Sequence, residues 1–529
     1  MATISSPTVR VGERRIPLVL PNRRDPRLHT AAVIISIHVI GITALGFRVS
    51  VPQIVAAIVT AAGVDVALTL RMTGKLVWPA SGMLTGSGVA LILRLAGMGA
   101  GDSWSWAGWH YFAGIAGVSV LTKYLIRFRG EHLFNPSNFG LVVAFLVLGS
   151  DVIEPLDFWW APLDFWMALA YAVIIGGGIA ITRRLNLLEM AVVYWVVLAA
   201  GLAILVASGH CMTAVWSVDP VCGTRFWTVL VTSPEVLIFM LFMITDPKTV
   251  PRGRLARFVF AATLGLLTTL LMAPQSVEFG AKVALLASLV IWSPARGLFD
   301  RFLPDRASGR SGLVSLMGRV LDRRREPLAG FTRGALAGSF VVLAAVGIIA
   351  AGAPARLPPD SAAAARTPVI EVDIDPDTLP TVEIHPDVRS LNLDVDDRYA
   401  RELAVNLAEN LAIEAEAVRR GDGSLLAAAS GGERLTEMQE RVAAAIAAGS
   451  RVVPVYHFKS LTLGVSETEG SQVGAALAFE GTGTVELVTY SGLGEEQSRS
   501  ETRFSSTLIM RQLGGERWVI VEVTDPPSG

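Results

Sequence analysis

The stretch MLFMITDPKTVPRGR, Met240–Arg254, ends a long apolar run with Thr-Asp-Pro before any basic residue appears. A helix needs about 20 apolar residues to cross the hydrocarbon core of a bilayer. Such a run usually stops at Lys or Arg, but here Asp246 stands at the helix C-terminus, where the helix dipole disfavours an anion. The stretch predicts a membrane-spanning helix with a polar end, which is either a self-contained turn or part of a ligand pocket.

The composition of the whole chain is typical of an integral membrane protein. Of its 529 residues, 52% are hydrophobic and only 17% are charged, whereas about a quarter of the residues in a soluble domain are charged. The mean hydropathy is +0.51. The net charge of −1 gives no basis for nucleic-acid binding, which relies on a surplus of Lys and Arg. We therefore expect the protein to be embedded in the lipid bilayer.

Eleven apolar runs are candidate membrane spans, and the fifth of them is short. Their approximate cores are 28–47, 51–70, 77–98, 106–125, 136–150, 164–182, 187–207, 226–245, 255–273, 278–296 and 334–352.

The loops between these runs alternate between basic and acidic, as the positive-inside rule requires. With a cytoplasmic N-terminus, the loop that holds Arg323, Arg324 and Arg325 is cytoplasmic, and Asp151 and Glu154 lie outside. The Arg-rich N-terminal arm has no cleavable signal pattern. We therefore expect a multi-pass protein of the bacterial plasma (inner) membrane, with its N-terminus in the cytoplasm and its C-terminal domain outside.

The expected fold is an all-α polytopic membrane protein followed by an exported α+β domain. Its parts are a basic cytoplasmic arm, a ten-span membrane core, a basic cytoplasmic linker, an eleventh transmembrane helix, an extended linker and the exported domain. They cover residues 1–27, 28–300, 301–333, 334–352, 353–395 and 396–529, respectively.

The ten core spans divide into two halves of five. Because five is an odd number, the second half would cross the membrane in the orientation opposite to that of the first half. Inverted repeats with broken helices at the midplane are a common plan of transporters. Prolines with polar neighbours stand at suitable places, including Asn135-Pro136, Ser233-Pro234 and Ser293-Pro294. The alternative is that proline is simply commoner in membrane helices.

The exported region begins with helical spacing over 396–430 and 433–448, which strand-like alternation follows up to the segment GERWVIVEV. This order, helices and then a curved antiparallel sheet, resembles the cone fold of nuclear-transport-factor-2-like (NTF2-like) domains. We expect residues 396–529 to contact other membrane or exported subunits.

The two cysteines, Cys211 and Cys222, fall in one predicted outer loop. Disulfides persist on the outer side of the membrane, so a bond between them is favoured over two free thiols.

Two polar stretches are candidates for a ligand pocket. One is the opening stretch, where Thr245 and Asp246 either build a turn whose charge Lys248, Arg252 or Arg254 offsets, or line a pocket. The other, HLFNPSNFG, starts a helix at Asn135-Pro136 with Asn138 one turn later. A helix N-terminus presents unpaired N–H groups to an anion or a polar ligand.

Together these stretches resemble the NqrB/RnfD membrane flavoprotein family. This family comprises membrane components of two ion-pumping respiratory complexes, the sodium-translocating NADH:quinone reductase and the Rnf ferredoxin:NAD oxidoreductase. The similar segments are HLFNPSNFG, FMITDPKTVPRGR and EFGAKVALLASLVIWSPARGLFD, within about residues 50–302. A branch named enediyne-biosynthesis membrane proteins is still more similar, with segments like HLFNPSNFGLV and SPEVLIF.

The resemblance implies a flavin, FMN or riboflavin, held by Asn135, Asn138, Thr245 and Asp246, with Arg252 and Arg254 at the phosphate. The family attaches FMN covalently to the threonine of a Ser-Gly-Ala-Thr motif, which this sequence lacks. The flavin expected here is therefore non-covalent.

Ionisable residues inside spans are costly and point to a function. Glu235 and Asp65 are candidates for an ion pathway, and Glu189 lies near a span. For Glu235 the alternative is a buried ion pair with Lys282 or Arg94. His38 and His110 lack the spacing of haem ligands, and no metal site is expected.

Three functions remain open. The first is a flavin-binding membrane subunit of an electron-transport system, coupled to ion movement, as in an ion-translocating oxidoreductase. The second is a transporter or channel on the same inverted-repeat scaffold without a redox cofactor. The third is an assembly protein, associated with enediyne or other secondary metabolism, whose exported domain binds a partner.

Overall fold

The structure is a computed structural model of the chain. It describes residues 8–11, 14–22, 25–96, 98, 102–128, 130–150, 152–155, 163–214, 221–303, 339, 341–355, 372, 374–386, 388, 395–466, 476–492, 495–512 and 518–524.

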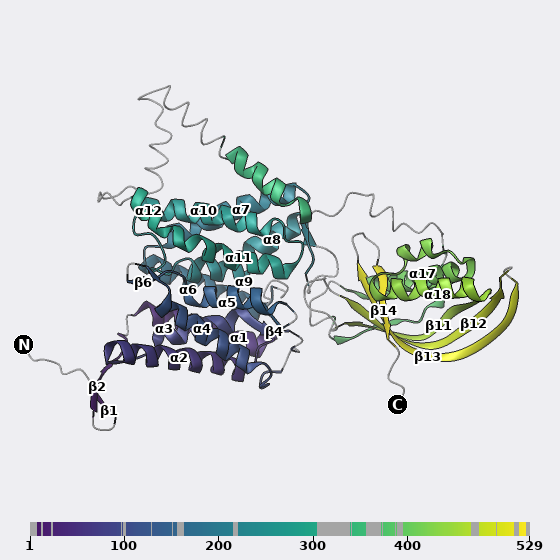
Figure 1. Ribbon diagram of the computed structural model, residues 1–529, viewed down its shortest axis with the longest axis horizontal. Helices are drawn as coiled ribbons and strands as arrows, with labels where there is room; N and C mark the ends of the chain where they lie inside the picture. The colour runs from purple at the N-terminus through teal and green to yellow at the C-terminus, as the bar shows by residue number, and fades with distance from the viewer. Residues whose placement is uncertain are drawn as a thin grey trace, which may run out of the picture. The chain divides into compact units, whose positions relative to one another are not determined.

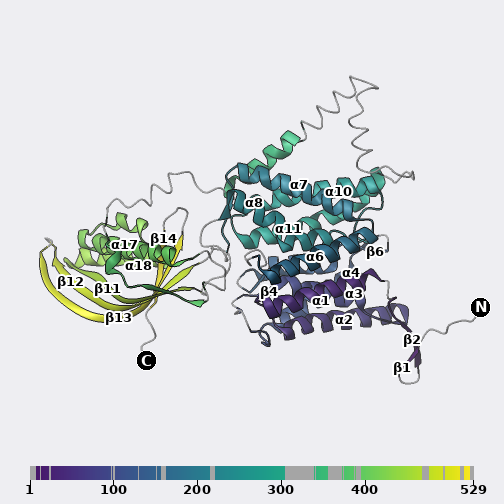
Figure 2. The same cartoon turned by 180° about the vertical axis from the view of Figure 1, so that it is seen from behind.

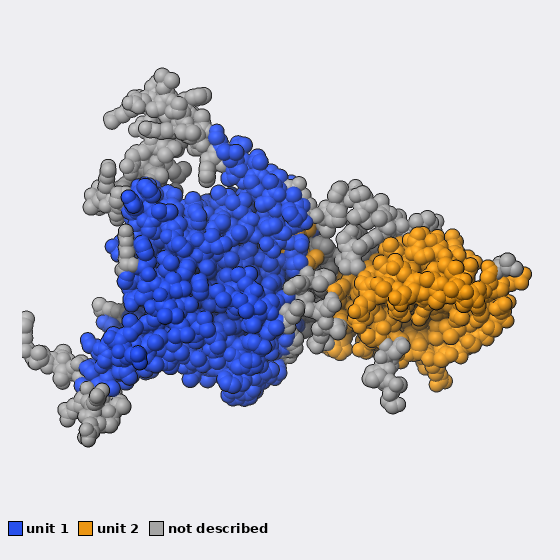
Figure 3. Space-filling model, viewed as in Figure 1, with its two compact units in different colours: residues 1–210, 222–355 blue, residues 211–221, 356–529 orange. Residues whose placement is uncertain are grey.

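The chain forms two compact units, which Figure 3 distinguishes by colour. Unit 1 comprises residues 1–210 and 222–355, and unit 2 comprises residues 211–221 and 356–529. Unit 1 is helical, whereas unit 2 combines helices with a large sheet (Figure 1).

Within the described residues, unit 1 includes the helices α1 Pro26–Ala44, α2 Val51–Thr73, α3 Ala80–Ile92, α4 Trp109–Leu125, α5 Pro136–Leu148, α6 Phe165–Arg184, α7 Leu188–Ala207, α8 Gly223–Thr232, α9 Pro234–Ile238, α10 Arg254–Met272, α11 Glu278–Trp292 and α12 Arg296–Phe302. Short strands connect them: β1 Thr8–Val11, β2 Arg14–Val19, β3 Leu76–Val77, β4 Leu93–Leu95, β5 Arg127–Phe128, β6 Glu131–His132 and β7 Ile153–Pro155.

Within the described residues, seven helical segments are long and apolar enough to cross a membrane. They are Pro26–Ala44, Val51–Thr73, Phe165–Arg184, Leu188–Ala207, Gly223–Met243, Arg254–Met272 and Glu278–Phe302. Shorter apolar helices cover Ala80–Ile92, Pro136–Leu148 and Val341–Ala351. The expectation of a helical protein with long apolar helices is confirmed, and these helices are compatible with a multi-pass membrane protein.

The predicted third span, 77–98, is helical only over Ala80–Ile92. After α3 the chain becomes extended, and β4 pairs antiparallel with β7, with Arg94 opposite Glu154. The helix has to end where this pairing begins, because the strand ladder takes over the backbone hydrogen bonds. The charged groups of Arg94 and Glu154 form a buried ion pair at this point.

Helix packing in unit 1 follows a recurring pattern, and the packed helices lie together in both views of Figures 1 and 2. Helix α2 packs against α3 and α4, as α7 packs against α8 and α10. Helix α4 packs against α5, as α10 packs against α11. Two further pairs, α1 with α6 and α5 with α11, each join the first five helices to the later ones, and α3 also packs against α1 and α4.

The closest approach between α2 and α3 depends on glycine. A Cβ atom on Gly86 would lie 2.5 Å from the carbonyl oxygen of Ala57, and one on Gly82 would lie 2.6 Å from the Cβ of Asp65. Small residues let apolar helices pack backbone to backbone, where dispersion and weak polar contacts hold them. This packing brings the N-terminus of α3 close to the side chain of Asp65.

Unit 2 contains a five-stranded sheet in the order β10 Val382–Ile384, β11 Ser450–Val465, β12 Leu477–Ser491, β13 Glu496–Gln512 and β14 Trp518–Thr524. The pairing is antiparallel except between β10 and β11, which run parallel. Helices α17 Asp397–Arg420 and α18 Gly432–Ala448 lie over the curved sheet (Figure 1). The predicted helices and the strands that follow them are confirmed, whereas β10 lies in the segment 353–395 that was predicted to be an extended linker.

The core of unit 2 lies between α17 and the sheet. Leu403, Leu407 and Leu411 of α17 pack with Phe479 and Trp518 of the strands, and all of them are buried. Their spacing of four residues places them on one helical face.

A buried ion pair joins the two helices of unit 2. The Arg434 guanidinium on α18 donates to Glu414 on α17 at 2.7 Å, and both side chains are at most 4% exposed.

Candidate functional site

The apolar run that ends at Asp246 is a broken helix. Helix α8 stops at Thr232, and α9 starts at Pro234 with the Ser233 hydroxyl accepting from the Val236 N–H at 3.2 Å. Proline cannot donate a backbone hydrogen bond, which explains the break. After Ile238 the helix widens to a π-helix over Phe239–Met243, a feature that often marks functional sites.

The Thr-Asp-Pro turn is held from both sides. The Thr245 hydroxyl donates to the Leu241 carbonyl at 2.6 Å. One carboxylate oxygen of Asp246 accepts from the Lys248 N–H at 3.0 Å, which caps the turn. The other carboxylate oxygen lies 3.0 Å from Nε2 of His132. Asp246 is therefore both a turn cap and the partner of a side chain from a distant segment.

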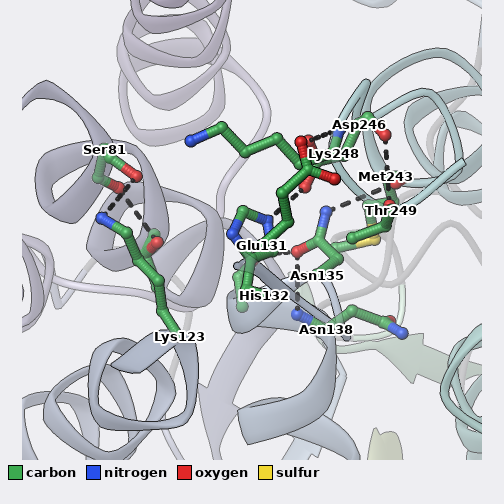
Figure 4. A network of polar contacts seen from close by, with 12 residues as sticks. Ser81, Lys123, Glu131, His132, Asn135, Asn138, Met243, Asp246, Lys248 and Thr249 are labelled. Atoms are coloured by element: carbon green, nitrogen blue, oxygen red, sulfur yellow. Dashed lines mark hydrogen bonds and ion pairs between the residues drawn. The ribbon is translucent and has the colours of Figure 1, made fainter. Parts of the chain in front are cut away.

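Asn135 connects this turn to the start of α5. As the N-cap of α5, its Oδ1 accepts from the Ser137 hydroxyl at 3.0 Å and from the Asn138 N–H at 3.4 Å. Its Nδ2 donates to the Met243 carbonyl at 3.3 Å, across 108 residues of sequence. Figure 4 shows that these side chains converge between the two segments. An N-cap residue thereby also satisfies an end carbonyl of the π-helix.

A cavity of about 460 Å³ lies at this convergence. Its polar lining includes Asn135, Thr245, Asp246, His132 and Lys248. Its apolar wall comes from α1, α3, α6 and the broken helix, with Ile34, Ile37, Leu84, Leu91, Ile181, Ile238, Leu241 and Phe242. A mostly apolar wall with a few convergent polar groups is typical of small-molecule sites.

Two charged groups at the entrance to α1 also line the cavity and neutralise each other. Arg27 donates to both carboxylate oxygens of Asp25. This side-chain hydrogen bond lowers the pKa of Asp25 below its ordinary value, although partial desolvation opposes it. Asp25 is therefore ionised at neutral pH, and the pair adds no net charge to the cavity.

Three of the residues predicted for the site lie elsewhere. Asn138 is buried and donates from Nδ2 to the Leu286 carbonyl at 2.9 Å, which ties α5 to α11. The backbone N–H of Arg252 donates to Asp300 at 2.8 Å. Arg254 pairs with Glu189, so it is not the partner of Asp246.

Asp65 caps the start of α3. Its carboxylate accepts from the Gly82 N–H at 3.1 Å, from Lys123 Nζ at 2.7 Å and from the Tyr124 hydroxyl at 2.6 Å. Lys123 also donates to the Ser81 hydroxyl at 3.0 Å, and Ser81 lines the cavity. A chain of polar contacts thus leads from Asp65 to the cavity wall.

Sequence reasoning did not single out His132, Lys123 or Ser81. His132 stands only three residues before Asn135, within the quoted polar stretch. Lys123 is an ionisable residue at the end of the predicted span 106–125, and the rule applied to Asp65 and Glu235 would have marked it too. Ser81 carried no signal beyond its place beside a helix break.

The second candidate of the ion pathway, Glu235, lies on α9 at 3.8 Å from Lys282. Lys282 is itself 2.5 Å from Glu278, whereas Arg94 pairs with Glu154. Of the two partners considered for Glu235, the structure places Lys282 beside it.

The histidines outside the site have local contacts. Nε2 of His38 lies 3.3 Å from the Ser87 carbonyl, and the ring centroid of His110 lies 4.3 Å from that of Tyr111, with the rings tilted by 39°. Across the described ranges, no three His, Cys, Asp or Glu side chains are grouped as metal ligands.

The two cysteines stand on a small two-stranded sheet of β8 Cys211–Met212 and β9 Val221–Cys222. Both are disulfide-bonded.

Comparison with known proteins gives no match to a protein-family model and no match to a curated protein. What the structure defines is the class: within the described ranges, a mainly helical chain with seven apolar helices of spanning length and a C-terminal sheet.

Proposed function

We propose that this chain is a membrane subunit of an electron-transport system that binds a flavin, FMN or riboflavin, non-covalently in the cavity at the helix break. The observation that carries the proposal is the cavity itself. It brings Asn135 together with Thr245 and Asp246, three of the six residues that the resemblance to the NqrB/RnfD flavoprotein family implies.

The lining suits a planar ring with one apolar and one polar edge. The isoalloxazine ring has a dimethylbenzene side, which the Ile and Leu wall would cover, and a pyrimidine side with one N–H donor and several acceptors. The Asp246 carboxylate can accept from that N–H. The second N–H of the Asn135 amide can donate to a ring oxygen or nitrogen. These are the roles a protein has toward a cofactor: binding, orientation and tuning of its charge.

A cation for the phosphate of FMN comes from Lys248 in this proposal. Lys248 is exposed and lines the cavity, whereas the predicted Arg254 pairs with Glu189. Riboflavin lacks the phosphate, so it would leave Lys248 in solvent.

The proposed core is a ten-span inverted repeat of five plus five helices. Support comes from the packing, when α1–α5 are exchanged with α6–α11 and α8 and α9 count as one helix. The exchange converts three packed pairs, α2–α3, α2–α4 and α4–α5, into α7–α8, α7–α10 and α10–α11, and it returns α1–α6 and α5–α11 to themselves. In such folds, substrates and coupling ions bind near the midplane between broken helices. The cavity is lined by α3, the start of α5 and the segment from Ile238 to Lys248 that follows the helix break.

The remaining parts of the proposal concern location and partners. The core would lie in the bacterial inner membrane, with the NTF2-like domain exported and in contact with other membrane or exported subunits of an ion-translocating oxidoreductase. The curved sheet with helices on one side supports the choice of an NTF2-like fold.

An absorbance spectrum of the purified full-length protein tests the proposal. We expect the two visible bands of a flavin, and release of the flavin into the supernatant on denaturation, because no covalent bond holds it. A colourless protein that takes up neither added FMN nor riboflavin would reject the proposal in favour of a transporter or channel on the same scaffold.

A further inference from the structure

The hydroxyl group of Ser81 on α3 is held by an ammonium group behind the wall of the main cavity. Lys123 Nζ donates to Ser81 Oγ at 3.0 Å and to the carboxylate of Asp65 at 2.7 Å. The described lining of the cavity includes Ser81 but not Lys123. Ser81 therefore stands between the ammonium group and a ligand in the cavity.

The direction of this hydrogen bond leaves the O–H of Ser81 free to donate. In its ion pair with Asp65, Lys123 is an ammonium group, which has three donors and no acceptor. Ser81 Oγ must therefore accept, and a hydroxyl group that accepts still has one hydrogen to donate. Within the described residues, Lys123 is the only hydrogen-bond partner of the Ser81 hydroxyl. The O–H is thus available to a ligand in the cavity.

The other side of the cavity has the complementary character. Figure 4 shows Ser81 with Lys123 on one side and His132, Asn135 and Asp246 on the other. The Asp246 carboxylate can only accept hydrogen bonds, whereas the Ser81 hydroxyl donates one. A ligand that satisfies both has a donor towards Asp246 and an acceptor towards Ser81. The ring system of a flavin carries both, one N–H among several acceptors.

We propose that Ser81, polarised by Lys123, donates to a ring acceptor of the flavin and binds the reduced form more tightly than the oxidised form. A flavin that has taken up two electrons and one proton carries one negative charge, which is spread over its ring acceptors. A hydrogen bond to a charged acceptor is roughly twice as strong as one between neutral groups. The identity of the ligand rests on the proposed function, whereas the polarised hydroxyl does not. Ser81 contacts the ligand in this proposal, and Lys123 is a positioning residue.

The coupling between Lys123 and position 81 can be measured without any flavin. An ammonium group stabilises a neighbouring thiolate, which is the reactive form of a thiol. At pH 7, the thiol of Ser81→Cys should therefore react with N-ethylmaleimide about tenfold faster than that of the double variant Ser81→Cys/Lys123→Met. Equal rates would reject the polarised hydroxyl.

Thr30→Cys is the matched control for this experiment. Thr30 also lines the cavity, but its hydroxyl donates to the Pro26 carbonyl of its own helix at 3.2 Å. Addition of Lys123→Met should leave its reaction rate unchanged. A general change of the cavity in the lysine variant would alter both rates and would not support the coupling.

Binding of FMN and riboflavin, oxidised and after reduction by dithionite, tests the effect on the ligand. We expect Ser81→Ala to weaken binding of the reduced flavin about tenfold more than binding of the oxidised flavin. This difference lowers the midpoint potential of the two-electron couple by about 30 mV. Ser81→Thr keeps the hydroxyl and should restore the wild-type potential, and the control Thr30→Val should leave it unchanged. Ser81→Ala keeps the pair of Lys123 and Asp65, so this measurement does not depend on the folding of the lysine variant.

The two measurements distinguish this inference from the proposed function. A faster thiol reaction in a protein that binds no flavin would support the polarised hydroxyl and reject the flavin as its ligand. If flavin binds and Ser81→Ala weakens both forms equally, the preference of Ser81 for the reduced form is wrong, whereas the proposed function stands.

Discussion

Nε2 of His132 lies 3.0 Å from a carboxylate oxygen of Asp246, although 114 residues separate the two along the chain. His132 ends β6 just before α5, and Asp246 forms the turn after the π-helix. With the bond from Asn135 to the Met243 carbonyl, this contact joins the two segments at the cavity. The ends of two half-helices therefore depend on each other for their polar contacts.

The substitution Asp246→Asn should empty the flavin site without unfolding the protein. Asparagine keeps an oxygen that can accept from the Lys248 N–H but loses the charge. A hydrogen bond to a charged group contributes about 1.5–3 kcal/mol, so we expect flavin affinity to fall roughly 10- to 100-fold. Titration of apoprotein with FMN and riboflavin measures it.

Matched variants complete this experiment. Asn135→Ala and Thr245→Ala should also weaken flavin binding, whereas Arg252→Ala should not, because the structure holds Arg252 by its backbone N–H to Asp300. Unchanged affinity in Asp246→Asn, Asn135→Ala and Thr245→Ala together would place the flavin elsewhere.

Gly86→Ala should destabilise unit 1. The new Cβ would meet the carbonyl oxygen of Ala57 at 2.5 Å, and such overpacking typically costs about 1–3 kcal/mol. Gly63→Ala is the control on the neighbouring helix, because a Cβ there meets nothing within 4 Å. Thermal unfolding in one detergent compares the two, and equal melting temperatures for both variants would contradict the close approach of α2 and α3.

Glu414→Gln should destabilise unit 2 by about 3–5 kcal/mol, because it removes the buried partner of Arg434 and leaves this guanidinium only the half-exposed Glu437. Hydrogen exchange of the α17 amides in the full chain measures the effect. Glu416→Gln is the control on the same helix, since Glu416 pairs with the exposed Arg419 and Arg420. We expect a loss of less than about 1 kcal/mol there. Equal protection in the two variants would contradict a structural role for the buried pair.

The pH dependence of this control follows from its pKa. The hydrogen bond from Arg419 lowers the pKa of Glu416 below its ordinary 4.5, although desolvation opposes it and Arg420 adds to it. A carboxyl with a lowered folded pKa stabilises the fold fully above its unfolded pKa. Its contribution therefore disappears as the pH falls below 4.5 through the folded value, and Glu416→Gln should remove that part of the acid sensitivity.

Reduction should destabilise the loop between the two cysteines. Peptide mass spectrometry without reductant should find Cys211 and Cys222 linked, in agreement with their bonded state. Closing a short loop typically stabilises a fold by about 2–4 kcal/mol, so thermal unfolding with reductant should begin at a lower temperature. Two freely alkylated thiols in membrane-purified protein would contradict the bond.

Labelling tests the proposed orientation. A cysteine at Gly492, in unit 2, should react with an impermeant reagent from outside the cell. A cysteine at Arg323, which lies outside the described residues, should react only after permeabilisation. Labelling of Arg323→Cys in intact cells would contradict the proposed topology and indicate the opposite orientation.

Local sequence patterns were enough to predict the helices and their breaks. The informative patterns were apolar runs near the spanning length, an Asn-Pro and a Ser-Pro at helix starts, and an Asp-Pro at a helix end. Each proline affects the backbone of only a few neighbouring residues. Their effects on backbone hydrogen bonding do not depend on the rest of the chain. The same holds for unit 2, where the change from helical to alternating spacing separates α17 and α18 from the strands.

The members of the site were predicted only in part. Asn135, Thr245 and Asp246 line the cavity, whereas Asn138 ties α5 to α11 and Arg254 pairs with Glu189. The side chain of a helical residue one turn after the N-cap contacts the helix that packs on its side. The local sequence does not specify which helix that is. The strand that ends the predicted third span likewise exists because β7 lies beside it.

The sequence by itself determined the long apolar helices and the breaks at Asn-Pro, Ser-Pro and Asp-Pro, because hydrophobic length and proline act locally. Only the tertiary structure decided which polar groups meet. It set His132 against Asp246 and Lys282 between two carboxylates, since these contacts join segments that are far apart in the chain or on different helices. A buried charge needs a partner of opposite charge, and the packing of the whole fold decides which partner lies beside it.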